Sequence, residues 1–185
     1  MAYKGGVRDC NTIVDGRIPL WLTVHEAGHL IARIQLVAAW NLAGLENPSS
    51  FESIRVWLDQ RGKPRGLCQW GYREPLSFRY QAIISAAGPV AEARIRHAKR
   101  CNCLTAGEDH EIIMRSQRRG LADIDEALDE ASFIVRSCWP EIIKLGTYLQ
   151  THHVLTLPQV SRLLDLKNGQ YIYNETTRPD MRYGA

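Results

Sequence analysis

Thr23-Val24-His25-Glu26-Ala27-Gly28-His29-Leu30 is the stretch that decides the fold of this chain. It carries the pattern H-E-x-x-H inside an apolar run, residues 20–37, that contains no proline or aspartate and predicts a helix. Residues four apart lie on one helix face, so His25 and His29 can present two imidazoles to one metal ion. Glu26 lies beside them and can take a proton from an attacking water, as in zinc hydrolases. The alternative is two histidines that share a helix face without binding metal.

The bulk composition is that of one ordinary globular domain spanning residues 1–185. Hydrophobic residues make up 45% of the chain and charged residues 23%, and 185 residues are enough to bury a core. The net charge of +3 is too small to indicate binding to nucleic acid, so we expect no nucleic-acid partner.

The N-terminal segment and the cysteines indicate a cytoplasmic protein. Residues 1–9 have no apolar core of the kind a signal peptide needs, and no uncharged stretch is long enough for a membrane anchor. The five cysteines are irregularly spaced, which favours reduced thiols. Cys101 and Cys103 form a C-x-C pair, a weak indication of metal binding on its own.

A β-hairpin is predicted after the H-E-x-x-H helix, which should run from Pro19 to about Trp40. Residues 53–58 alternate apolar with polar side chains, 59–66 form a turn, and 67–70 return as a second strand. The edge of such a hairpin can pair with an extended peptide and lay it across the metal. The alternative is a small sheet that only covers the helix. The candidate substrate-binding residues are Gly66, Leu67, Cys68, Gln69 and Trp70.

The remainder of the chain has helical patterns. Residues 77–87 are predicted to form a helix that stops at Gly88-Pro89, and a second helix starts at Val90. Thr105 and Glu108 have the spacing of a capping box that opens the next helix. Further helices are expected from Asp123, from Pro140 to about Gln150, and from Pro158 to Leu166.

The predicted fold class is therefore mainly α, with a small hairpin beside the H-E-x-x-H helix and a C-terminal helical bundle. Within the single domain, residues 17–104 hold the helix, the hairpin and the supporting helices. Residues 105–167 form the C-terminal helices, and residues 168–185 form a tail.

A catalytic zinc site usually takes a third protein ligand besides the two histidines. The segment 108–111 is favoured, because an acid in the first turn of a helix can point toward a neighbouring helix, although the helix dipole alone also favours acids there. A third histidine six residues after His29 is absent, since position 35 is Gln35. Spacing leaves several candidates open: Glu92, His97, Glu108, Asp109, His110, Glu111, His152 and His153.

Four segments resemble the FtsH-type peptidase domain, the zinc-protease half of membrane-anchored AAA proteases. They are the motif 25–29, the strand pair 54–56 with 65–67, the small-residue helix 86–92 and the segment 105–109. The resemblance implies a zinc cofactor with Asp109 as third ligand, and it leaves Glu108 as a helix cap. The resemblance is also compatible with self-association into a homo-oligomer.

The chain departs from that family in having no G-x-x-x-x-G-K-[ST] motif and no membrane anchor. We therefore expect a stand-alone, ATP-independent zinc metallopeptidase that acts on unfolded or flexible polypeptide segments. Two alternatives remain: a non-catalytic zinc-containing binding or regulatory protein, and a metallopeptidase with one dedicated target.

Overall fold

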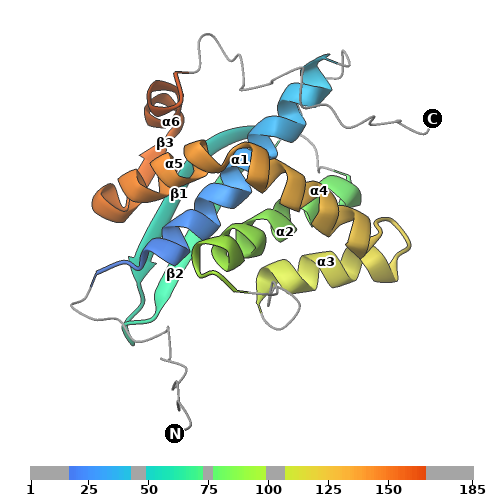
Figure 1. Ribbon diagram of the computed structural model, residues 1–185, viewed down its shortest axis with the longest axis horizontal. Helices are drawn as coiled ribbons and strands as arrows, with labels where there is room; N and C mark the ends of the chain where they lie inside the picture. Colours follow the sequence, from blue (N-terminus) through green and yellow to red (C-terminus); the bar gives the residue numbers. More distant parts are fainter. Residues whose placement is uncertain (1–16, 43–48, 73–76, 99–106, 166–185) are drawn as a thin grey trace, which may run out of the picture.

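The computed structural model describes residues 17–42, 49–72, 77–98 and 107–165 (Figure 1). The predictions for Cys101, Cys103, Thr105 and the tail 168–185 lie outside these residues. The described part is mainly helical with one small antiparallel sheet, as the sequence predicts. Its elements are α1 (Leu20–Leu42), β1 (Ser49–Leu58), β2 (Pro64–Tyr72), α2 (Phe78–Ile95), α3 (Glu108–Arg118), α4 (Ile124–Ser137), α5 (Trp139–His152), β3 (Val154–Thr156) and α6 (Leu157–Leu163).

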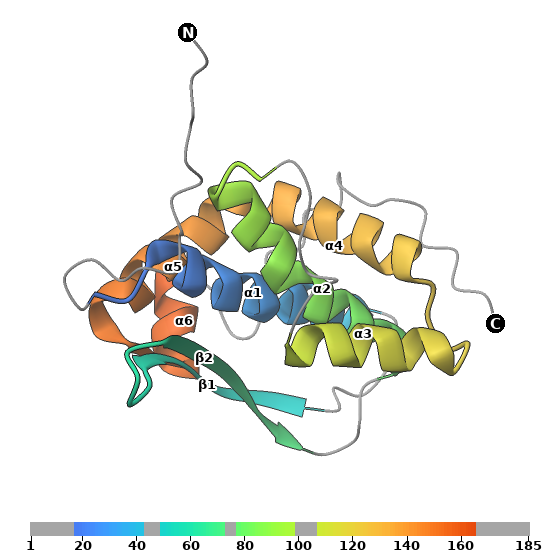
Figure 2. The ribbon, with the colours of Figure 1, turned by 90° about the horizontal axis from the view of Figure 1, so that it is seen from below.

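Helix α1 is the central element of the fold. The carbonyl of Pro19 accepts the first hydrogen bonds of the helix, from the N–H groups of Leu22 (3.1 Å) and Thr23 (3.4 Å). The helix packs against α2, α5 and the sheet, which surround it in Figures 1 and 2. Val24 and Leu30, which lie on different faces of α1, are both fully buried. A helix that is buried nearly all round can position polar side chains rigidly inside the molecule.

Helix α2 runs antiparallel to α1 and lies very close to it. Ala87 and Ala91 of α2 face Gly28 of α1, and all three are buried. The predicted break at Gly88-Pro89 is wrong, because α2 continues through Pro89 to Ile95. Pro89 removes one backbone hydrogen bond, but Pro89 is buried together with Gly88 and Ala91, so packing outweighs the local preference.

The predicted hairpin is present and gains a third strand. The strand order is β2-β1-β3, so β1 is central and β2 lies at an edge of the sheet. Ile54 and Val56 of β1 point into the core on the side of the helices, and the sheet lies along one side of α1 (Figure 2). Strand β3 was not predicted, because three residues are too few to show an alternating pattern.

The four predicted C-terminal helices are present, with one difference at the start of α3. The N-cap of α3 is Gly107, so this helix begins later than the capping box of Thr105 and Glu108 predicts. Helix α4 starts where it was predicted, and Asp123 caps it, since its side chain accepts from the N–H groups of Asp125 and Glu126. Helices α3, α4 and α5 pack mainly on α1 and α2, whereas α6 packs on α5 and the sheet, and one hydrophobic cluster extends from Ile18 to Leu164. Among the described helices, none is long and apolar enough to cross a membrane.

The change Gly28→Ala should lower the free energy of unfolding by about 1–3 kcal/mol. An added Cβ would lie 2.7 Å from the carbonyl oxygen of Ala87 and 2.9 Å from the Cβ of Ala91. This overlap outweighs a gain of about 1 kcal/mol in helix propensity. Urea denaturation measures the difference. Ser132→Ala, at an exposed position of α4, is the control and should stay within about 0.5 kcal/mol of wild type. Equal stability of Gly28→Ala and wild type would contradict the tight approach.

Candidate metal centre

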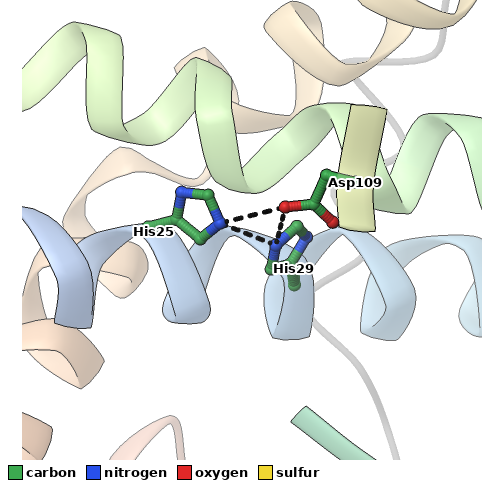
Figure 3. Close-up of side chains that lie close together, drawn as sticks. All are labelled: His25, His29 and Asp109. Atoms are coloured by element: carbon green, nitrogen blue, oxygen red, sulfur yellow. Dashed lines mark hydrogen bonds and ion pairs between the residues drawn. The ribbon is translucent and has the colours of Figure 1, made fainter. Parts of the chain in front are cut away.

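His25 and His29 lie one turn apart on α1 and point toward the same space (Figure 3). Their rings are 4.7 Å apart between centroids and nearly perpendicular, at 80°. Their two Nε2 atoms are 3.0 Å apart. His29 is buried, and the side chain of His25 is only 16% exposed. The helical spacing thus brings the two imidazoles together, as the motif predicts.

Asp109 reaches this pair from the first turn of α3. Its Oδ2 lies 3.2 Å from Nε2 of His25 and 3.3 Å from Nε2 of His29 (Figure 3). The three side chains form a group that could hold a metal ion, and no second such group occurs among the described residues. Helix α3 packs on α2, and this packing places its N-terminal turn over the histidines.

The other nitrogen of each imidazole is held by a fixed acceptor. Nδ1 of His29 donates to the backbone carbonyl of Ile84 at 2.7 Å, and Nδ1 of His25 donates to Oε2 of Glu92 at 3.0 Å. A carbonyl oxygen only accepts, so the proton of neutral His29 must be on Nδ1. The carboxylate of Glu92 fixes the same tautomer in His25. Both Nε2 atoms therefore direct lone pairs toward Asp109.

Three acceptor atoms thus face one another at 3.0, 3.2 and 3.3 Å. At metal–ligand distances of about 2.0–2.1 Å, two ligands of a tetrahedral zinc ion lie about 3.3 Å apart. The spacing and the donor set, two imidazole nitrogens and one carboxylate, both fit such an ion. The three residues leave a fourth position to a water or a substrate group.

The pKa values of these groups reflect the same crowding of acceptors. Burial works to lower the pKa of His25, but hydrogen bonds to Asp109 and Glu92 raise it to about 10. Burial works to raise the pKa of Asp109, whereas the nearby His29 and His25 bring it below its usual range. Without a metal ion, the lone pairs of the two Nε2 atoms and of Oδ2 of Asp109 would repel one another, so one imidazole must carry an additional proton. A bound cation would replace that proton.

Glu26 lies between α1 and β2, next to the two histidines. It is 6% exposed, and a Cβ on Gly66 of β2 would overlap its carboxyl group. Burial raises the pKa of Glu26, while the charges of His29 and His25 act in the opposite direction. A glycine at position 66 therefore allows the strand to pass directly beside this carboxyl group.

Strand β2 directs some of its backbone groups away from the sheet. The N–H of Val56 donates to the carbonyl of His153 at 2.9 Å, so the backbone of Val56 faces β3, and its neighbour Arg55 faces β2. Arg55 pairs with Leu67, and antiparallel strands alternate between bonded and non-bonded pairs. The N–H and C=O groups of Gly66 and Cys68 therefore point away from β1, to the outer edge of β2, which we call the open edge because no other strand in the described part of the chain pairs with it.

All five predicted substrate-binding residues lie in β2. Gly66 and Cys68 offer backbone groups at the edge, while the exposed side chains of Leu67 and Gln69 lie on the opposite face of the sheet from Glu26. The structure does not describe the side chain of Trp70.

The other candidates for the third ligand lie elsewhere. Glu92 contacts the far nitrogen of His25, and His110 lines a surface hollow with Met114 and Leu121. The role of Glu92 as a partner of His25 was missed, although a carboxylate on an apolar helix face could have suggested it. Exposed positions are occupied by His97, Glu108, Glu111, His152 and His153.

No protein-family model matches the chain, and no curated protein matches its sequence. The resemblance to the FtsH-type peptidase domain therefore remains a prediction that depends on the motif residues.

The change Asp109→Ala should lower zinc affinity at least tenfold, because one of three ligands is lost. Zinc content after dialysis and competition with a chromophoric chelator measure the affinity. His110→Ala is the matched control, since it alters the next residue of α3 outside the triangle. Zinc loss in His110→Ala together with retention in Asp109→Ala would show that the ligand is wrongly assigned.

Proposed function

We propose that this protein is a zinc-dependent metalloendopeptidase that cleaves unfolded or flexible polypeptide segments without ATP. The observation that carries the proposal is the triangle of Nε2 of His25, Nε2 of His29 and Oδ2 of Asp109, with Glu26 beside it. Neighbouring hydrogen bonds orient both histidines so that their lone pairs converge there. Because the three acceptor atoms are held in place and face one another, the three residues are better suited to binding a divalent metal ion than to packing alone.

Each residue has a distinct task in the proposed reaction. His25, His29 and Asp109 would hold zinc, which supplies Lewis-acid activation of water and of the scissile carbonyl. Glu26 would take the proton of the attacking water and deliver it to the leaving amine. Its burial between α1 and Gly66 holds the carboxyl group in place and limits competition from bulk water.

The open edge of β2 supports a polypeptide as substrate. Gly66 and Cys68 present backbone donors and acceptors along the strand that passes Glu26. An extended peptide that pairs with this edge would gain main-chain hydrogen bonds, which are largely independent of its side chains. Only a flexible or unfolded segment can adopt this extended form, so folded proteins should be poor substrates.

The change Glu26→Gln tests the proposed reaction. It should lower the rate of casein cleavage by about 10²–10⁴-fold, because the amide cannot accept the proton. Zinc content should stay at the wild-type level, since Glu26 is not in the ligand triangle. Glu108→Gln, which alters an exposed carboxylate in the first turn of α3, should cleave normally. Undiminished cleavage by Glu26→Gln would contradict the assignment, and zinc binding without any cleavage by wild type would favour a binding protein.

N-methylation of a cleaved peptide tests the proposed strand pairing without altering the protein. Methyl groups on alternate backbone nitrogens should slow cleavage, because those N–H groups would bond to Gly66 and Cys68. Methyl groups on the intervening nitrogens, which face solvent, are the control and should have little effect. Cleavage rates measured by mass spectrometry for a full scan should alternate with a period of two. A uniform response would contradict pairing at the edge of β2.

A further inference from the structure

The support of His25 extends beyond Glu92. The Glu92 carboxylate uses both of its oxygens: Oε2 accepts from Nδ1 of His25 at 3.0 Å, and Oε1 accepts from Nη1 of Arg96 at 2.7 Å. Glu92 and Arg96 are one turn apart on α2, where i,i+4 side chains meet. Because each oxygen has its own partner, rotation of the carboxylate would break both contacts.

Arg96 is itself held from the other side. Its guanidinium lies 4.3 Å from the centroid of the Trp21 ring, a cation–π contact. Trp21 is one turn before His25 on α1. Four side chains therefore form a series of contacts between two antiparallel helices, from His25 on α1 through Glu92 and Arg96 on α2 to Trp21 on α1. We name this set the Trp21 relay.

The partial burial of the relay makes its contacts persistent. The side chains of Arg96 and Glu92 are 28% and 22% exposed, so water screens their ion pair less than it screens a pair on the surface. Arg96 is also the C-cap of α2, and its backbone N–H bonds to the carbonyl of Glu92. A planar guanidinium that is stacked and bonded in this way has little freedom to move.

We propose that Arg96, held against Trp21, is a positioning residue that fixes Glu92 and thereby sets the affinity of the site for zinc. Arg96 contacts none of the three ligand atoms, so it acts only through Glu92 and the orientation of the His25 ring. This inference depends on the metal site of the proposed function, but not on peptidase activity.

A second arginine on the same helix serves as a matched control. Arg94 lies 4.5 Å from the ring centroid of Trp139, so it makes the same kind of contact with a tryptophan. Among the described residues, however, Glu92 is bonded to Arg96 and not to Arg94. Arg94 is exposed whereas Arg96 is partly buried, so the thermal unfolding of the two variants is compared together with their zinc affinity.

The experiment measures the zinc dissociation constant of the full chain by competition with a chromophoric chelator. Arg96→Gln should weaken zinc binding about tenfold, the lower end of the range for changes in partners of metal ligands. Arg94→Gln should bind zinc as wild type does. Arg96→Lys keeps the charge but loses the planar guanidinium, so its zinc affinity should lie between those of the two glutamine variants. Circular dichroism and thermal unfolding test whether each variant is folded.

A double-mutant cycle separates positioning from a general structural effect. Glu92→Ala should weaken zinc binding about 10–100-fold, and adding Arg96→Gln to it should have no further effect, because the two residues act in series. Independent, multiplying effects would overturn the relay, as would equal zinc affinity in Arg96→Gln and wild type. If wild type binds no zinc, the proposed metal site is wrong, and the proposed role of Arg96 is wrong as well. If zinc is bound but no substrate is cleaved, only the peptidase proposal fails.

Discussion

The close approach of α1 and α2 is the constraint on which the candidate site depends. Gly28 has no side chain to separate the two helices, and Ala87 and Ala91 are small enough to lie against it. Gly88 has a related role, because a Cβ there would overlap the ring of His29. At this separation a backbone carbonyl of α2 and the side chain of Glu92 can both reach imidazole nitrogens on α1. Larger residues at these positions would move the acceptors away from the histidines, and the lone pairs would no longer converge.

The sheet lies on another side of the site, and its strand order and register determine which backbone groups of β2 point outward. Strand β3 pairs with the middle of β1, so β1 is central and β2 forms one edge of the sheet among the described strands. The register then determines that Gly66 and Cys68, rather than Leu67, direct their backbone groups outward. Because Gly66 also lies against Glu26, the open edge and the carboxyl group are adjacent. The possible path of a peptide therefore follows from strand order and register as much as from the residues of β2.

Much of this arrangement could be predicted from the sequence, and the failures have physical causes. The pairing of His25 with His29 follows from helical periodicity alone, so it was predictable. Pro89 was expected to end a helix, but local preference did not reveal that packing against α1 would keep α2 continuous. The third strand was too short to show a period. Residue spacing left the partner of the two histidines open, and only the resemblance to a known family indicated Asp109, which the fold places beside them. The bond from His25 to Glu92 was missed, because it depends on how distant segments pack.

Helix α3 has a weaker connection to α1 than the proposed ligand role of Asp109 would suggest. It packs mainly on α2 and makes few contacts with α1, so the acceptor triangle is its main connection to the central helix. Without a cation, that connection depends on a proton held between Asp109 and the imidazoles. A divalent ion would replace the proton with three metal–ligand bonds and tie α3 to α1. Since such an ion binds only the folded arrangement, its binding free energy would add to the stability of the fold. The same three residues would then serve both the chemistry and the attachment of α3.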